Sequence, residues 1–155
     1  MVGPTSPKPG DSRCEALEEN GWTSGVFDAF SSQLGPVWTR GRGADGELEV
    51  AFYATDAHTN GHLGTVHGGL LMTFADVSLG MKVGEVIGGP RCTTVSLQVQ
   101  FVSAGQVGDF LVCCPEVVRR TRNLMFMRGL ITVGDRPVAT AEGIWKIWDA
   151  PAADC

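Results

Sequence analysis

The sequence predicts a single α+β domain in which one long helix packs on one face of an antiparallel sheet. Three observations predict this class. One helical pattern extends from Gly68 to about Val83, apolar and polar residues then alternate at a period of two, and turn signals separate the alternating segments. Strands joined by short turns pair antiparallel, and a lone apolar helix is best buried against the resulting sheet.

Length and composition are those of one globular domain. The 155 residues are 43% apolar and carry a net charge of −5. The Pro-, Gly- and Ser-rich residues 1–13 are expected to be disordered, with the folded domain spanning residues 14–150. The net negative charge disfavours a nucleic-acid partner. No apolar run approaches the roughly 20 residues of a membrane-spanning helix. Five cysteines without a CxxC pair predict a reduced, cytoplasmic protein.

The first half of the chain predicts short helices at residues 14–20 and 26–34. Two strands follow at 37–43 and 47–54, joined across the turn signal Ala44-Asp45-Gly46. The spacing of the long helix then places four apolar residues on one face, which we expect to be buried: Leu70, Phe74, Val77 and Met81.

Alternation after the helix predicts four more strands, giving a sheet of about five or six strands. The first strand places Thr94 on its polar phase and four apolar residues on the phase expected to face the core: Val95, Leu97, Val99 and Phe101. The other three strands cover residues 109–120, 124–133 and 137–148. On the last strand, small residues on one face let a helix lie close to the sheet: Ala139, Ala141 and Gly143.

Asp76 stands among apolar residues of the predicted helix. A carboxylate in such surroundings is unfavourable unless it is hydrogen-bonded or functional. Its neighbours on the helix surface are the small residues Gly69, Thr73 and Gly80, which leave room for a ligand. The pattern is compatible with a catalytic base, and equally with a structural carboxylate that is solvated or has a buried partner.

The Gly68-Gly69 pair opens the same helix. The first turn of a helix presents unpaired N–H groups and a partial positive charge, which suit a developing oxyanion. Glycines would let a substrate carbonyl approach those groups, although a glycine pair can also serve only to form a turn.

Helix geometry places Asp76 and the Gly68 N–H far apart within one subunit. Asp76 lies eight residues beyond Gly68, which is about 12 Å along the axis. A base and an oxyanion donor must both lie within about 3 Å of the reacting groups. If both are catalytic, two antiparallel helices related by a two-fold axis must each supply one of them, and the protein is at least a dimer.

The run from His58 to Gly69, followed by Asp76 and Gly80, resembles the signature of the PaaI-like hotdog-fold acyl-CoA thioesterases. The shared pattern is an Asn, a Gly, then His-Gly-Gly, and an acid eight residues after the first Gly of the pair. The resemblance covers roughly residues 36–148. It implies a hotdog fold, in which the sheet wraps around the long helix, and a homodimer that often pairs into a homotetramer.

The resemblance also implies residue roles. Asp76 would act as general base or nucleophile toward the thioester carbonyl, and the Gly68 N–H would polarise the carbonyl oxygen. Asn60 would position the water or the thioester, and Thr94 would help to hold the water. The segment from Asn60 to Gly68 is one residue longer than in close relatives, which puts the role of Asn60 in question. Three further residues would contact the substrate: His67, Gly69 and Thr73.

Four arginines gather on one predicted hairpin, where bidentate guanidinium contacts would suit the phosphates of coenzyme A. A solvated hairpin tip is the alternative. Substrate contact is expected from Arg119, Arg120 and Arg122, with Arg128 nearby.

Three histidines, at positions 58, 62 and 67, lie in a Gly-rich loop without a cluster of Cys or carboxylate residues. This pattern predicts no metal site. His67 is instead expected to hydrogen-bond locally and fix the loop at the helix start.

The leading hypothesis is hydrolysis of a fatty-acyl or aryl-acyl CoA thioester to free acid and CoA, without a cofactor. A non-catalytic acyl-CoA-binding protein is the alternative, and a dehydratase acting through His67 is a third. The sequence leaves open the acyl group, and whether Asp76 activates water or forms an acyl intermediate.

Overall fold

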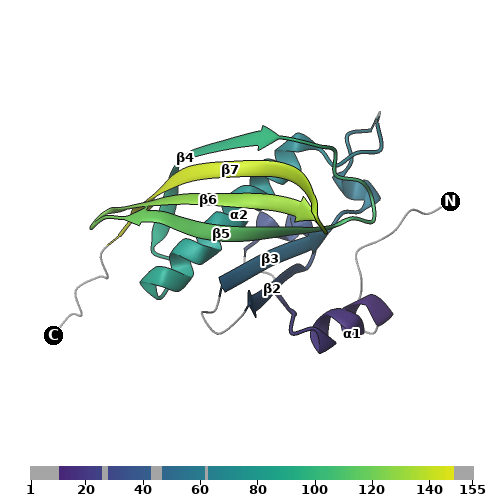
Figure 1. Cartoon of the computed structure of the whole chain (residues 1–155), viewed down its shortest axis with the longest axis horizontal. Helices are drawn as coiled ribbons and strands as arrows, with labels where there is room; N and C mark the ends of the chain where they lie inside the picture. The colour runs from purple at the N-terminus through teal and green to yellow at the C-terminus, as the bar shows by residue number, and fades with distance from the viewer. Residues whose placement is uncertain (1–10, 26–27, 43–46, 62, 149–155) are drawn as a thin grey trace.

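The computed structural model describes residues 11–25, 28–42, 47–61 and 63–148. Its centre is one antiparallel sheet of seven strands in the order β1-β2-β3-β5-β6-β7-β4, with α2 lying behind it (Figure 1). The strands are β1 (Thr23–Gly25), β2 (Val37–Arg42), β3 (Glu47–Tyr53), β4 (Cys92–Phe101), β5 (Phe110–Arg120), β6 (Leu124–Val133) and β7 (Arg136–Ile147). This is the α+β hotdog arrangement that the sequence predicted.

The expected strand number was too low, because β1 has only three residues and pairs with the edge of β2. So short a segment carries no alternation that could be detected in the sequence. The first helix, α1 (Ser12–Glu19), begins two residues before the predicted start, since the Asp11 side chain caps it by accepting from the Arg13 N–H at 2.9 Å. The expected disordered segment otherwise falls on residues 1–10, outside the described residues.

The helix predicted at 26–34 is replaced by a short 3₁₀ helix, η1 (Ser31–Leu34). Val26 and Phe27 lie outside the described residues, as do residues 149 and 150 at the end of the expected domain. A second 3₁₀ helix, η2 (Asp56–His58), precedes the loop that leads to the long helix.

The long helix, α2 (Gly68–Ile87), continues four residues past its predicted end and stops at Gly88, whose φ of 74° is left-handed. Of the four residues expected on its buried face, Phe74 is fully buried, while Leu70, Val77 and Met81 are only partly buried. The face that meets the sheet is offset by about one residue and comprises Leu71, Phe74, Ala75, Ser78, Leu79 and Val83. Among the described residues, no helix combines the length and apolar character needed to cross a membrane.

A β-bulge interrupts the pairing of β4 with β7 between Thr94 and Ser96. The extra residue reverses the alternation on the N-terminal side of the bulge. Val95 is consequently 61% exposed, so its expected place in the core was wrong. Phe101, expected in the core as well, is 54% exposed at the end of the same strand, whereas Leu97 and Val99 pack against the core as predicted.

The main core lies between α2 and the central strands, and it includes the face of β7 that carries small side chains. Ala139, Ala141 and Gly143 are all buried, as the sequence predicted. Gly143 leaves no space for a side chain: a Cβ there would lie 2.6 Å from the Trp145 ring and 2.7 Å from the Ser96 carbonyl oxygen. The backbone of β4 can approach β7 at the bulge only because this position lacks a side chain.

Gly143→Ala is therefore expected to lower the free energy of unfolding by about 1–3 kcal/mol, because backbone and a buried ring must both move. Gly41→Ala is the matched control, since a Cβ on that strand glycine meets nothing within 4 Å. Urea denaturation of both variants measures the difference. Equal stability of the two would contradict the close approach at Gly143.

Candidate active site

Asp76 lies on the side of α2 that faces β4, where Thr94 Oγ1 donates a hydrogen bond of 2.6 Å to Asp76 Oδ1. The carboxylate is half-buried, not buried as its apolar neighbours suggested. No described residue donates to Oδ2. The structure thus brings together two residues that the sequence proposed separately, and leaves one carboxylate oxygen available to a reactant.

Both residues line an open cleft of about 650 Å³ between α2 and β4. Its other walls are mainly apolar or glycine, and include Val77, Gly80, Met81, Pro90, Cys92 and Trp145. At Gly80, a Cβ would lie 3.4 Å from Trp145 Nε1, so the glycine keeps the cleft open above that ring. Burial, with the Asp76 charge adding to it, raises the pKa of the Cys92 thiol. The dimensions and lining suit an apolar group next to a reactive carboxylate.

Asp28 also lines this cleft, although no pattern in the sequence pointed to it. Its Oδ1 accepts from the backbone N–H groups of Phe30 and Ser31 at 2.8 and 2.9 Å. The hydrogen bond from the Ser31 hydroxyl is the main cause that lowers the pKa of Asp28. The packing of η1 against α2 places this ionised group beside the cleft, and no sequence pattern predicts that packing.

The start of α2 forms a second feature. His67 Nδ1 accepts from the Gly69 N–H at 2.9 Å, so His67 caps the helix by the local hydrogen bond that the sequence predicted. The Gly69 N–H is therefore engaged, whereas the Gly68 N–H has no acceptor among the described residues. Gly68 lines a separate cleft of about 270 Å³ together with Leu71, Phe101 and Gly105. Gly68, not Gly69, is thus the donor open to a ligand.

Asn60 and Thr73 make local contacts. Asn60 Oδ1 accepts from the Leu63 N–H at 3.3 Å, and Thr73 Oγ1 donates to the Gly69 carbonyl at 3.0 Å. Neither is among the residues that line the two clefts. Thr73 lies about one turn before Asp76 on the same helix, and the roles expected of Asn60 and Thr73 remain predictions.

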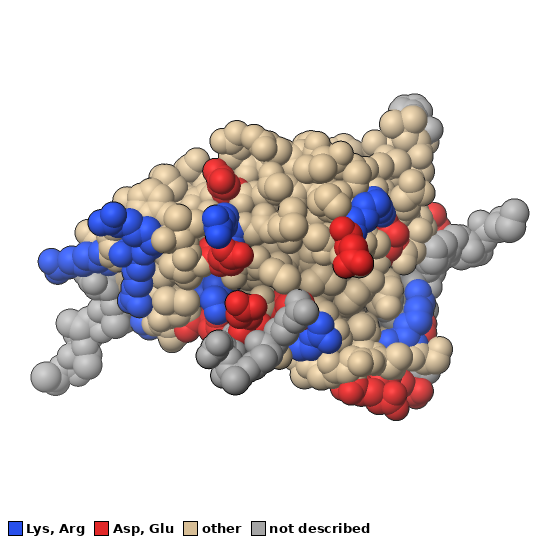
Figure 2. Space-filling view, viewed as in Figure 1, with Lys and Arg blue, Asp and Glu red and all other residues tan. Residues whose placement is uncertain are grey.

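Exposed arginines gather at the tip of the β5–β6 hairpin, at the left end of the molecule in Figure 2. Within the described chain, the three tip arginines form no ion pair and line neither cleft: Arg119, Arg120 and Arg122. Arg128 lies further along the hairpin and pairs with Glu116 at 2.7 Å. The expected phosphate contacts remain a prediction.

His58, the last residue of η2, has a structural role. Its Nδ1 accepts from the Thr55 N–H and its Nε2 donates to the Gln33 carbonyl, both at 3.0 Å. Burial lowers the pKa of this ring, which keeps it neutral. His62 lies outside the described residues. Over the described ranges, no three His, Cys, Asp or Glu side chains are grouped so as to hold a metal ion.

The family model of the thioesterase superfamily matches residues 63–140, which include Gly68, Asp76 and Thr94. The chain belongs to the thioesterase superfamily. A Pseudomonas aeruginosa protein, PA0474, named provisionally as an esterase, is 36% identical over 115 residues, covering 74% of this chain and 84% of the relative. This thioesterase-superfamily protein is thus a thioester hydrolase by family.

Solved structures agree with the PaaI-like resemblance. A Ralstonia eutropha protein, provisionally named a thioesterase and related to phenylacetic acid degradation, has a TM-score of 0.70 at 29% identity and covers 79% of this chain and 92% of its own. The Escherichia coli PaaI protein has a TM-score of 0.68 at 20% identity, covering 90% and 93%. The Bacillus halodurans protein BH2602, solved with CoA, has a TM-score of 0.68 at 20% identity, covering 89% and 87%. The last two likenesses concern the fold alone.

Proposed function

We propose that this thioesterase-superfamily protein hydrolyses fatty-acyl or aryl-acyl CoA thioesters to the free acid and CoA, with Asp76 as the reactive carboxylate. The observation that carries the proposal is the Thr94–Asp76 hydrogen bond of 2.6 Å within a largely apolar cleft of about 650 Å³. The CoA bound to the Bacillus halodurans relative supports a CoA thioester as the substrate class.

In this mechanism the Thr94 hydroxyl holds Asp76 Oδ1, and Oδ2 accepts a proton from water. The water oxygen attacks the thioester carbonyl carbon, the C–S bond breaks, and the departing thiolate takes the proton from Asp76. Direct attack by Oδ2 on the carbonyl carbon would instead break the C–S bond, release the CoA thiolate and give an acyl-Asp anhydride. Water then hydrolyses the anhydride to the free acid and the Asp76 carboxylate, and its second proton goes to the thiolate. In either route the apolar walls of the cleft receive the acyl or aryl group, and the Gly68 N–H stabilises the oxyanion.

The site is proposed to form between two subunits. Gly68 and Asp76 are about 12 Å apart along α2 and line different clefts. Among the described strands, β4 forms one edge of the sheet, where it pairs with β7 alone, and the three-residue β1 forms the other. The outer backbone groups of β4 are available to a second copy, as are the exposed side chains of Val95 and Phe101 and that of Val102, which follows the strand. A homodimer, and a homotetramer built from it, therefore belong to the proposal, with Arg119, Arg120 and Arg122 as candidate contacts for CoA phosphates.

The test is release of free thiol from a panel of straight-chain acyl-CoAs of increasing length, together with phenylacetyl-CoA and hydroxybenzoyl-CoA. At least one member is expected to be turned over with kcat/KM above about 10⁴ M⁻¹ s⁻¹. Calorimetric titration with CoA is run beside the assay. Binding of CoA without release of thiol from any member would contradict the proposal.

A further inference from the structure

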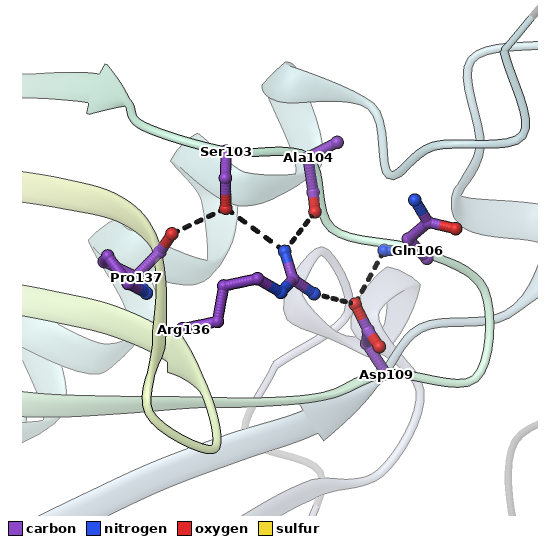
Figure 3. Close-up of polar contacts among 6 residues, drawn as sticks. All are labelled: Ser103, Ala104, Gln106, Asp109, Arg136 and Pro137. Atoms are coloured by element: carbon purple, nitrogen blue, oxygen red, sulfur yellow. Dashed lines mark hydrogen bonds and ion pairs between the residues drawn. The ribbon is translucent and has the colours of Figure 1, made fainter.

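Arg136 is the first residue of β7 and follows the tight β6–β7 turn. Its guanidinium donates to three acceptors in the loop between β4 and β5 (Figure 3). Nη1 donates to Ser103 Oγ at 3.1 Å and to the Ala104 carbonyl at 2.5 Å, and Nη2 donates to Asp109 Oδ2 at 2.9 Å. One side chain thus holds both the beginning and the end of the loop, residues 102–109.

The acceptors are themselves held in place. Asp109 Oδ2 also accepts from the Gln106 N–H at 2.8 Å, and Ser103 Oγ donates to the Pro137 carbonyl at 2.6 Å. The Asp109 side chain is only 20% exposed. A planar guanidinium with several fixed donors suits this arrangement, which a single-point cation reproduces only in part.

The same loop contacts the segment that leads into α2. The Gly105 carbonyl accepts from the Val66 N–H at 2.8 Å, two residues before Gly68. A Cβ on Gly105 would lie 3.2 Å from Val66 Cγ2, so the Gly105 backbone also packs closely against the Val66 side chain. At the end of β4, the Phe101 ring lies 3.1 Å from the place of a Cβ on Gly68. The loop therefore bounds the helix start on the side of the 270 Å³ cleft.

We propose that Arg136 is a positioning residue for the oxyanion donor: through the 102–109 loop it fixes where the Gly68 N–H points. The inference rests on the proposed function and assigns Arg136 no contact with the substrate. An oxyanion donor acts only within about 2.7–3.1 Å of the developing charge. A displacement of about 1 Å can lower the rate about a hundredfold. Loosening the loop should thus reduce turnover while leaving the acyl cleft beside Asp76 intact.

Arg136→Gln is expected to lower kcat about 10- to 100-fold while KM stays within about twofold, because ground-state binding is unaffected. Arg136→Lys should recover part of the loss, since an ammonium can still reach Asp109. Arg128→Gln is the matched control: this exposed arginine on the neighbouring strand pairs with Glu116 alone among the described residues and should keep wild-type kcat. If Arg136→Gln does not fold, Asp109→Asn loosens the same loop and should lower kcat in the same direction.

Two inhibitors separate positioning from a merely structural role. A trifluoromethyl-ketone analogue of the best CoA thioester forms a tetrahedral oxyanion, whereas the corresponding thioether lacks a reactive carbonyl. Arg136→Gln should weaken the ketone about tenfold or more and leave thioether binding unchanged. Unchanged kcat, or equal weakening of both analogues, would overturn the inference. Asp76→Asn is assayed alongside: if it is inactive while Arg136→Gln is fully active, only the role of Arg136 fails. An active Asp76→Asn variant would remove Asp76 from the mechanism, and only the absence of thiol release by the wild-type protein would reject the proposed function itself.

Discussion

The Asp76→Asn variant is expected to lose about a thousandfold or more in kcat, because an amide can neither accept the proton of water nor attack the thioester. The asparagine oxygen can still accept the hydrogen bond from Thr94, which spans 2.6 Å to the native carboxylate. The fold and the dimer should therefore persist, with KM little changed. Initial rates of thiol release measure the effect, and light scattering follows the assembly.

Thr94→Val and Thr94→Ser provide the graded controls. Valine removes the hydroxyl that holds Asp76 Oδ1 and should reduce kcat about tenfold, whereas serine keeps the hydroxyl and most of the activity. Near wild-type turnover of every thioester by Asp76→Asn would remove Asp76 from the mechanism. A normal rate in Thr94→Val would remove only Thr94.

Gly68→Pro is expected to lower kcat about 10²- to 10³-fold, because proline has no N–H to donate to the oxyanion. Proline is favoured at the first position of a helix. His67 has φ −64° and ψ 133°, the extended conformation that a residue before proline requires. The variant should therefore remove the donor and keep the helix.

Gly68→Ala is the matched control, because it keeps the N–H. Its Cβ would lie 3.1 Å from the Phe101 ring, so the ring must shift slightly in both variants. Alanine should retain most of the turnover. Equal losses in the two variants would show that the side chain at this position, and not the missing N–H, reduces the rate.

Mixing the two inactive proteins tests whether the site is shared between subunits. In a heterodimer of Asp76→Asn and Gly68→Pro, one of the two sites has an intact acid and an intact donor. Random exchange should restore about a quarter of the wild-type sites. No recovery, despite subunit exchange shown by mass spectrometry, would place both groups in one subunit.

Much of the fold was predictable because it follows from periodicity. The long helix, the strands of the second half and the small face of β7 all have regular patterns over ten or more residues. The failures lie where a pattern is short or interrupted. One extra residue in β4 reversed the expected direction of Val95 and turned Thr94 toward α2, although strand alternation had placed Thr94 on the polar phase.

Other features of the site depend on contacts between distant segments. The buried face of α2 is offset from the predicted one because Val77 and Met81 line the cleft. Apolar spacing alone does not distinguish a residue that faces the core from one that lines a ligand cleft. Asp28 reaches the same cleft from a segment some fifty residues earlier. The hydrogen bonds of Arg136 likewise join two turns that have no common sequence signal.

The thiol of Cys92 has a consequence for how the cleft handles an activated acyl group. A thiolate beside a thioester would exchange with it and leave the protein acylated on sulfur, since the thiolate is the reactive form. Burial and the charge of Asp76 raise the pKa of Cys92, so this sulfur stays protonated at neutral pH. Burial first, and the carboxylate proposed to activate water second, thus keep this competing acceptor protonated, which favours hydrolysis over transfer of the acyl group to the protein's own sulfur.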